Sequence, residues 1–217
     1  MTKQWFILAA GAALAIAPAA QAQDSMSAAF AAGGKNFTVA VPQGYCQPEG
    51  ADKALADAMA DLDTLNLTHV TLRDCNDPDG DYSLVKSERK AQQLGVPKAM
   101  FIALAAKQLE SELSQQAIAQ GMNQAGQDIA SGTGDAMTLS GGTAQAAGFD
   151  ADCAYITGSA VLGVGGQNIT TYFASCLTLA GGRVFAIHSY ATDLAKVPYD
   201  TLKARSRALG ASLVATP

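Results

Sequence analysis

Four cysteines are the residues with the clearest chemistry in this chain of 217 residues. They are Cys46, Cys75, Cys153 and Cys176. An even number of cysteines favours disulfides in an exported chain, and metal binding is the alternative that the residue type leaves open. The metal alternative has little support, because the chain contains neither a CxxC nor a CxH spacing.

Four cysteines allow three disulfide connectivities, and a glycine-rich turn favours one of them. Strand-like residues 151–161 and 168–178 flank this turn, which spans residues 163–166. A hairpin centred on the middle two turn residues places Cys153 directly opposite Cys176, within the range of a disulfide. The remaining two cysteines then form the second bridge, which joins the ends of two earlier strands.

The same hairpin register brings two tyrosines together. Thr157 faces Tyr172, and Tyr155 lies diagonal to it on the face that carries the cysteines. Tyrosines on a sheet are enriched at binding sites, although packing under a helix is equally common. We therefore take Tyr155 and Tyr172 as a candidate binding face and keep packing under a helix as the alternative.

Two histidines limit the hydrolytic chemistry that the chain can perform. A Ser-His-Asp site would have to use His69 or His188. We expect His69 to be solvated, because it alternates with the apolar face of its strand, and His188 to be hydrogen-bonded and partly buried. Since no GxSxG motif is present, we expect a non-enzymatic protein without catalytic residues. A hydrolase that uses His188 is the alternative.

An acidic turn is the best candidate for weak cation binding. It contains Asp74, Asn76, Asp77, Asp79 and Asp81. Hard cations such as calcium need several oxygen ligands on a flexible loop. An EF-hand is excluded, because alignment on Gly80 puts Cys75 and Lys86 at the first and last ligand positions. The alternative is a charged, soluble turn, and we expect no other metal site and no cofactor.

The N-terminus has the pattern of a secretory signal peptide. Lys3 precedes an apolar run from Trp5 to Ala17, and the small residues Ala20-Gln21-Ala22 follow. Thirteen apolar residues are too few to span a bilayer, so a retained anchor is the weaker interpretation. We expect cleavage after Ala22 and release into the periplasm, with secretion as a further option.

Composition excludes several classes of protein. The chain is 49 % hydrophobic and 15 % charged, with a formal net charge of −5. After the signal region no long apolar run remains, which argues against a membrane span in the mature chain. The hydrophobic content argues against a long disordered chain, and the negative charge argues against nucleic-acid binding. A periplasmic protein or a small molecule remains as the expected partner.

Hydrophobic periodicity predicts the helices and strands that position these residues. We expect a flexible leader over 23–34 and one domain over 35–217, with a mobile glycine-rich segment at about 121–148. Strands are expected at 37–41, 68–73, 82–86, 151–161, 168–178 and 183–190, and helices after Asp52, Pro97 and Pro198. Strands and helices do not alternate regularly, so we predict an α+β fold with an antiparallel sheet flanked by helices.

Two stretches of the chain resemble a family of small exported proteins of alphaproteobacteria. The first runs from Val41-Pro42-Gln43-Gly44-Tyr45-Cys46 to Asp74-Cys75, and the second contains Asp152 to Thr157, Thr170 to Leu179, Gly181-Gly182 and Tyr190. The architecture of that family is similar to the PsbP-like fold, a sheet sandwiched by helices. The resemblance implies an α/β/α sandwich with binding or assembly roles and brings no catalytic residues. It does not cover the glycine-rich middle of the chain.

Overall fold

The computed structural model describes residues 26–77, 80–90, 92–134 and 136–216. The elements of this part of the chain are, in order, β1 (Ser27–Ala32), β2 (Lys35–Ala40), β3 (Tyr45–Cys46), α1 (Gly50–Asp61), β4 (Asn66–Asp74), β5 (Tyr82–Glu88), α2 (Lys98–Leu109), α3 (Glu112–Thr133), β6 (Met137–Phe149), β7 (Ala154–Val164), β8 (Gln167–Ala180), β9 (Arg183–Ala191), α4 (Tyr199–Ser212) and β10 (Val214–Thr216). The predicted signal peptide and residues 23–25 of the predicted leader lie outside the described residues.

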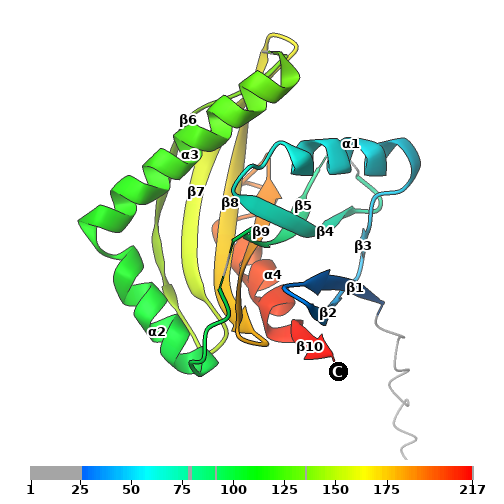
Figure 1. Ribbon diagram of the computed structural model, residues 1–217. Coiled ribbons are helices and arrows are strands. Elements are labelled where there is room, and N and C mark those ends of the chain that lie inside the picture. The colour runs from blue at the N-terminus through cyan, green and yellow to red at the C-terminus, as the bar shows by residue number, and fades with distance from the viewer. Residues whose placement is uncertain (1–25, 78–79, 91, 135, 217) are drawn as a thin grey trace, which may run out of the picture.

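Two antiparallel sheets form the framework (Figure 1). The larger sheet has the strand order β3-β4-β5-β9-β8-β7-β6, and the smaller one has the order β1-β2-β10. The predicted meander is present as β7, β8 and β9, which pair consecutively. The architecture is therefore α+β, with an antiparallel sheet flanked by helices, as the sequence predicts.

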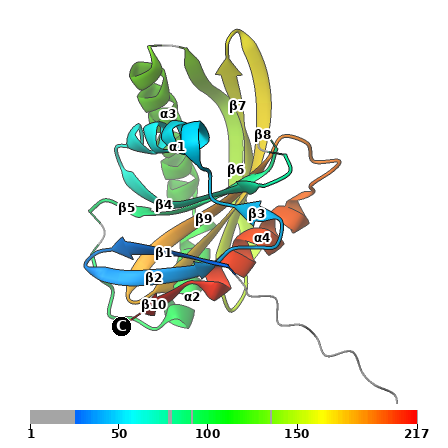
Figure 2. The same cartoon turned by 90° about the vertical axis from the view of Figure 1, so that its right-hand side faces the viewer.

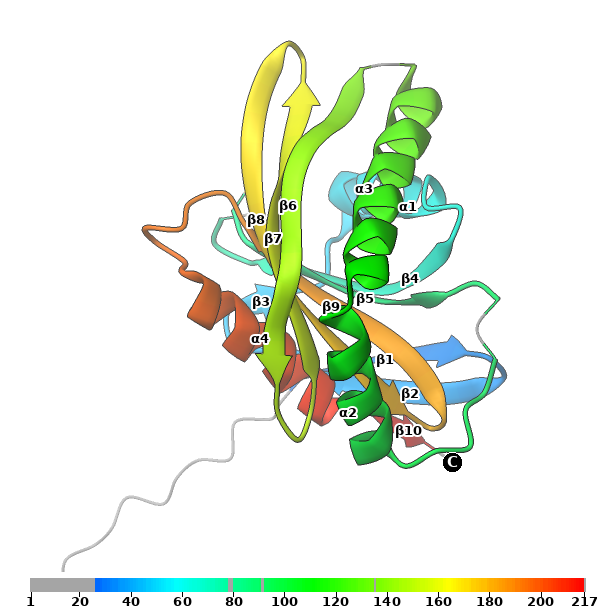
Figure 3. The same ribbon diagram turned by 90° about the vertical axis from the view of Figure 1, so that its left-hand side faces the viewer.

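Helices cover both faces of the large sheet, and the alternation of side chains along β7 shows which helix covers which face. Ala154 and Ile156 pack against α2, whereas Tyr155 belongs to the core cluster that contains Leu209 of α4 and Phe37 of β2. Figure 3 shows α2 and α3 along one face, and Figure 2 shows α4 beside the small sheet. In the described part of the chain, no helix is both long and apolar enough to cross a membrane.

The β7–β8 hairpin turns one residue later than predicted. Gly165 and Gly166 form its turn with φ of 57° and 81°, and a two-residue hairpin turn of this kind needs positive φ at both positions. A turn centred one residue earlier would require positive φ at Val164, which a β-branched residue rarely adopts. The register therefore moves, and Tyr172 faces Ser159 instead of the predicted threonine.

The predicted cysteine pairs are neighbours in the structure. Cys153 and Cys176 form a disulfide with a Cα–Cα distance of 5.1 Å. The two are diagonal neighbours and not directly opposed, because Tyr155 is the partner of Cys176 in the sheet. The second predicted pair, Cys46 and Cys75, is present as two free thiols, so the predicted second bridge is not formed in the structure.

Half of the predicted N-terminal leader is a strand. We expected a flexible segment over 23–34, but Ser27–Ala32 forms β1 and pairs with β2 through a turn at Gly33 and Gly34. Ala28 and Ala32 are buried against the sheet, so small residues provide the apolar face of this strand. The prediction was wrong there because alanine gives only a weak strand signal.

Regular structure also occupies the glycine-rich segment 121–148. The helix predicted from Pro97 is interrupted after Leu109, and α3 then continues to Thr133 before β6 begins. Gly142 lies at a bulge of β6 with φ of 139°, where a Cβ atom would come within 2.4 Å of the carbonyl oxygen of Ser159. Glycine thus permits close strand pairing here, and the mobility of the segment stays a prediction.

Candidate functional site

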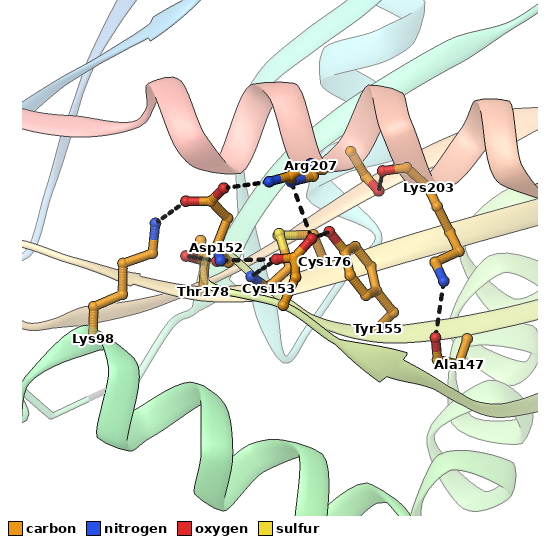
Figure 4. A network of polar contacts seen from close by, with 11 residues as sticks. Lys98, Ala147, Asp152, Cys153, Tyr155, Cys176, Thr178, Lys203 and Arg207 are labelled. Carbon is orange, nitrogen blue, oxygen red and sulfur yellow. Dashed lines mark hydrogen bonds and ion pairs between the residues drawn. A yellow bond between two sulfur atoms is a disulfide. The ribbon is translucent and has the colours of Figure 1, made fainter.

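A cavity of about 370 Å³ lies between the end of β6, the start of β7 and one side of α4. Its lining residues are Ala147, Gly148, Phe149, Asp150, Tyr155, Asp200, Lys203, Ala204 and Arg207. Figure 4 shows the polar contacts around it. The volume falls within the range of pockets that bind small molecules, about 300–1,000 Å³.

Asp150 organises the turn between β6 and β7. Its Oδ1 atom accepts hydrogen bonds from the backbone N–H groups of Asp152 at 2.8 Å and Cys153 at 3.0 Å. Its Oδ2 atom accepts one from the Tyr155 hydroxyl at 2.7 Å and forms an ion pair with Nε of Arg207 at 3.0 Å. Burial acts to raise the pKa of Asp150, but these donors outweigh it and hold the pKa below 3.8. The cavity wall therefore carries a fixed, ionised carboxylate whose charge is already compensated.

Asp152 connects the helices on the two faces of the sheet. Its Oδ1 atom lies 3.3 Å from Nζ of Lys98 on α2, and its Oδ2 atom lies 3.4 Å from Nη2 of Arg207 on α4. Its backbone carbonyl accepts a hydrogen bond from Thr178 on β8. As Figure 4 shows, each oxygen of the Asp152 carboxylate faces a cationic side chain of the protein.

Lys203 is the lining cation that has no carboxylate partner within ion-pair distance among the described residues. Its ammonium group donates to the carbonyl oxygen of Ala147 at 3.0 Å and lies 4.8 Å from the centre of the Tyr155 ring. A lysine ammonium has three donors, so two remain after this bond. Phe149, 59 % exposed, adds an apolar surface to the same cavity.

The two tyrosines of the predicted binding face lie beneath α4. Tyr155 is 3 % exposed, and burial together with its hydrogen bond to Asp150 raises its pKa. Tyr172 packs edge-on against Tyr199, with a distance of 6.2 Å between ring centres. Both tyrosines therefore pack under a helix, which was the alternative to a binding face. Of the two, Tyr155 also lines the cavity.

His69 points into the core, so the expectation that it is solvated was wrong. A β-bulge between Thr68 and Val70 interrupts the alternation of side chains on β4. The imidazole stacks on Phe30 at 4.8 Å, and its Nε2 atom lies 2.8 Å from Oγ of Ser87. Burial, aided by the positive charge of Arg183, lowers the pKa of His69 to about 4.

His188 has the hydrogen-bonded, partly buried position that its strand pattern predicts. Its Nδ1 atom lies 2.7 Å from Oγ of Ser175, and burial, with a smaller effect of the Lys86 charge, lowers its pKa to about 3. The serine is only 3 % exposed. A hydrolase needs a hydroxyl that a substrate can reach, so this geometry does not favour the hydrolase alternative.

Two carboxylates of the acidic turn after β4 interact with other groups of the protein. Asp81 pairs with Arg205 at 3.0 Å, and Oδ1 of Asp74 accepts a hydrogen bond from the backbone N–H of Asn76. Asp79 lies outside the described residues. Elsewhere in the turn and in the rest of the described chain, no three His, Cys, Asp or Glu side chains are placed to hold a metal ion. Weak calcium binding at this turn stays a prediction.

Sequence reasoning missed most of the cavity. Asp200, Lys203 and Arg207 recur at helical spacing, but this pattern is also typical of a solvent-facing side of the last helix. Arg205 of the same helix is largely buried and lies 4.8 Å from the centre of the Tyr45 ring. The signal that could have found the site is the short Asp-x-Asp turn at Asp150, because such turns fix their own backbone.

Comparisons with known proteins give structural likenesses alone. A scan against models of protein families finds no match, and no curated protein matches the chain. The solution structure of cyanobacterial PsbP (CyanoP) from Synechocystis is similar with a TM-score of 0.41 and 10 % identity, covering 93 % of this chain and 99 % of that one. The crystal structure of LpqN, involved in cell envelope biogenesis of Mycobacterium tuberculosis, is similar with a TM-score of 0.29 and 13 % identity, covering 91 % of this chain and 88 % of that one. With TM-scores below 0.5, neither likeness bears on function.

Proposed function

We propose that the protein is an exported, non-enzymatic binding protein whose cavity between β6, β7 and α4 holds a small organic anion. The observation that supports this proposal is the ammonium group of Lys203, which lines the cavity without a carboxylate partner among the described residues. The Cys153–Cys176 disulfide supports export, because such bonds form and persist in oxidising compartments such as the periplasm.

The other lining residues define the chemistry of the ligand. The anionic group binds Lys203, and an aromatic or branched apolar group packs against the exposed ring of Phe149. Arg207 contributes little to the binding energy because Asp150 and Asp152 already compensate its charge. Asp200 lines the same cavity and disfavours ligands with more than one negative charge. The expected ligand is therefore a monoanion, such as an aromatic carboxylate.

Titration of the mature protein with benzoate tests this proposal, with benzylamine as a probe of the same shape and opposite charge. Chemical-shift changes in NMR spectra report binding at residues 147–155 and 200–207. We expect benzoate to bind at these residues and benzylamine not to bind. Lys203→Met should weaken benzoate binding by about tenfold or more, because a charge-assisted hydrogen bond is lost.

Two further variants control for general effects of charge. Lys196→Met removes an exposed lysine just before α4, and its binding should equal that of the unmodified protein. Asp200→Asn should strengthen benzoate binding, because it removes a repulsive carboxylate from the lining. The proposal is overturned if benzoate leaves residues 147–155 unchanged, or if Lys196→Met weakens binding as much as Lys203→Met.

A further inference from the structure

Cys46 and Cys75 lie side by side at one edge of the large sheet. Cys46 is opposite Arg73 in the β3–β4 pair, and the N–H of Cys75 donates to the carbonyl oxygen of Gly44 at 2.9 Å. Cys75 is thus two residues beyond the partner of Cys46 and on the same face of the sheet. The bonded pair Cys153–Cys176 is also offset by two residues from direct opposition, but in the other direction along the strands.

Solvent access distinguishes the two cysteine pairs. Cys153 and Cys176 are 0 % exposed, whereas Cys46 is partly exposed and Cys75 is exposed. Thiol–disulfide exchange requires a thiolate to approach a sulfur atom directly, so burial protects the first pair and not the second. Exposed disulfides are typically the labile ones in proteins.

A guanidinium group lies beside the exposed pair. Arg73 hydrogen bonds to Asp52 on α1 and is the residue directly opposite Cys46 in the β3–β4 pair. Nearby positive charge stabilises a thiolate and makes it available as a nucleophile. The hydrogen bond to Cys46 is the largest cause that raises the pKa of Cys75, to about 11. Cys46 lies directly opposite Arg73 in the sheet, so we take Cys46 as the nucleophile of the pair.

Apart from the buried strand β4, the chain between the two cysteines is weakly attached to the rest of the domain. It contains α1, which has no buried residue, and Leu55 on this helix is 64 % exposed. Polar contacts hold the segment in place, chiefly Arg73 with Asp52 and Thr64 with Asp128 on α3. A bond between Cys46 and Cys75 would close this segment into a loop, which restricts its motion.

We propose that Cys46 and Cys75 are a reversible dithiol–disulfide pair that exchanges with a thiol–disulfide oxidoreductase. The Cys46 thiolate attacks one sulfur of the partner's disulfide, and that disulfide breaks to leave a mixed disulfide and one partner thiolate. Cys75 then loses its proton and attacks the Cys46 sulfur, which releases the second partner thiolate. Two electrons and two protons leave this pair, and the partner is reduced to a dithiol. The Cys153–Cys176 disulfide takes no part.

Equilibration of the folded protein in glutathione redox buffers tests the proposal. Acid quenching, alkylation and mass spectrometry then report the oxidation state of each cysteine pair. We expect the Cys46–Cys75 bond to be half reduced at a reduced glutathione concentration at least about tenfold below that needed for Cys153–Cys176. Equal resistance of the two bonds, or a Cys46–Cys75 pair that oxidised glutathione does not oxidise, would overturn it.

Single-cysteine variants test the order of attack. Cys75→Ser retains Cys46, and Cys46→Ser retains Cys75 in the same surroundings. Oxidised glutathione at neutral pH should form a mixed disulfide with Cys75→Ser at least about tenfold faster than with Cys46→Ser, because Arg73 lies directly opposite Cys46. Near-UV circular dichroism establishes that both variants are folded. Equal rates, or a faster reaction at Cys75, would contradict the assignment of Cys46 as the nucleophile.

Discussion

Replacement of Tyr155 by phenylalanine removes one hydroxyl from the cavity wall and leaves the ring in place. The hydroxyl donates to Oδ2 of Asp150 at 2.7 Å, from a side chain that is 3 % exposed. A hydrogen bond to a charged group contributes about 1.5–3 kcal/mol to stability. The lower end of this range applies, because Asp150 retains two backbone donors and Arg207. We therefore expect Tyr155→Phe to lower the free energy of unfolding by about 1.5 kcal/mol.

Denaturant and thermal unfolding at neutral pH measure this loss. For a domain of this length it corresponds to a decrease in Tm of about 3–6 °C. Tyr172→Phe is the matched control, since its ring packs against Tyr199 and its hydroxyl makes no hydrogen bond within the described structure. The control should be nearly neutral. Equal stability of the two variants would refute the assignment of the Tyr155 hydroxyl as a structural donor.

The pH dependence of the loss provides a second test. The folded-state pKa of Asp150 is below 3.8, so its ionised form stabilises the fold above pH 3.8 and this contribution is lost as the pH falls further. The difference in stability between the unmodified protein and Tyr155→Phe should therefore shrink below pH 3.8. A difference that stays constant down to about pH 2.5 would show that the hydroxyl acts independently of the carboxylate charge.

Three further predictions concern the framework. Cys153→Ser, made together with Cys176→Ser, should lower the free energy of unfolding by about 3 kcal/mol in denaturant titrations, because a loop with a sequence separation of 23 is opened. The His69 pKa of about 4 predicts stability that is full above pH 6.5 and falls between pH 6.5 and 4, and His69→Asn should flatten this part of the Tm profile. Gly142→Ala should lower Tm, because its Cβ would meet a carbonyl oxygen at 2.4 Å, whereas Gly121→Ala in α3, where nothing lies within 4 Å, should raise it slightly.

Local sequence signals predicted the C-terminal third of the fold well. Strand-like segments separated by Gly-Gly turns indicated the β7–β9 meander, and Pro198 followed by helically spaced leucines indicated α4. The register was harder to predict, since it depends on which residues adopt positive φ. Weighing the β-branched side chain of Val164 against Gly166 would have corrected it.

Features that depend on tertiary contacts could not be predicted. The bulge on β4 that turns His69 inward has no marker in its own strand, and the stacking partner Phe30 comes from a segment that we expected to be a flexible leader. The cavity has the same origin, because Lys203 and Phe149 lie far apart in the sequence and meet only after α4 packs against the sheet. Secondary-structure propensity and hydrophobic periodicity report local structure and contain no information on contacts between residues that are distant in the sequence.

One carboxylate also gives the protein a mechanical link between its layers. Asp152 holds Lys98 at the first residue of α2 and Arg207 in the middle of α4, while its backbone is bonded to the central strand β8. The helices on opposite faces of the sheet therefore share one carboxylate as the partner of a cationic side chain. We therefore expect a ligand in the cavity beside Arg207 to affect α2 as well, although α2 does not line that cavity.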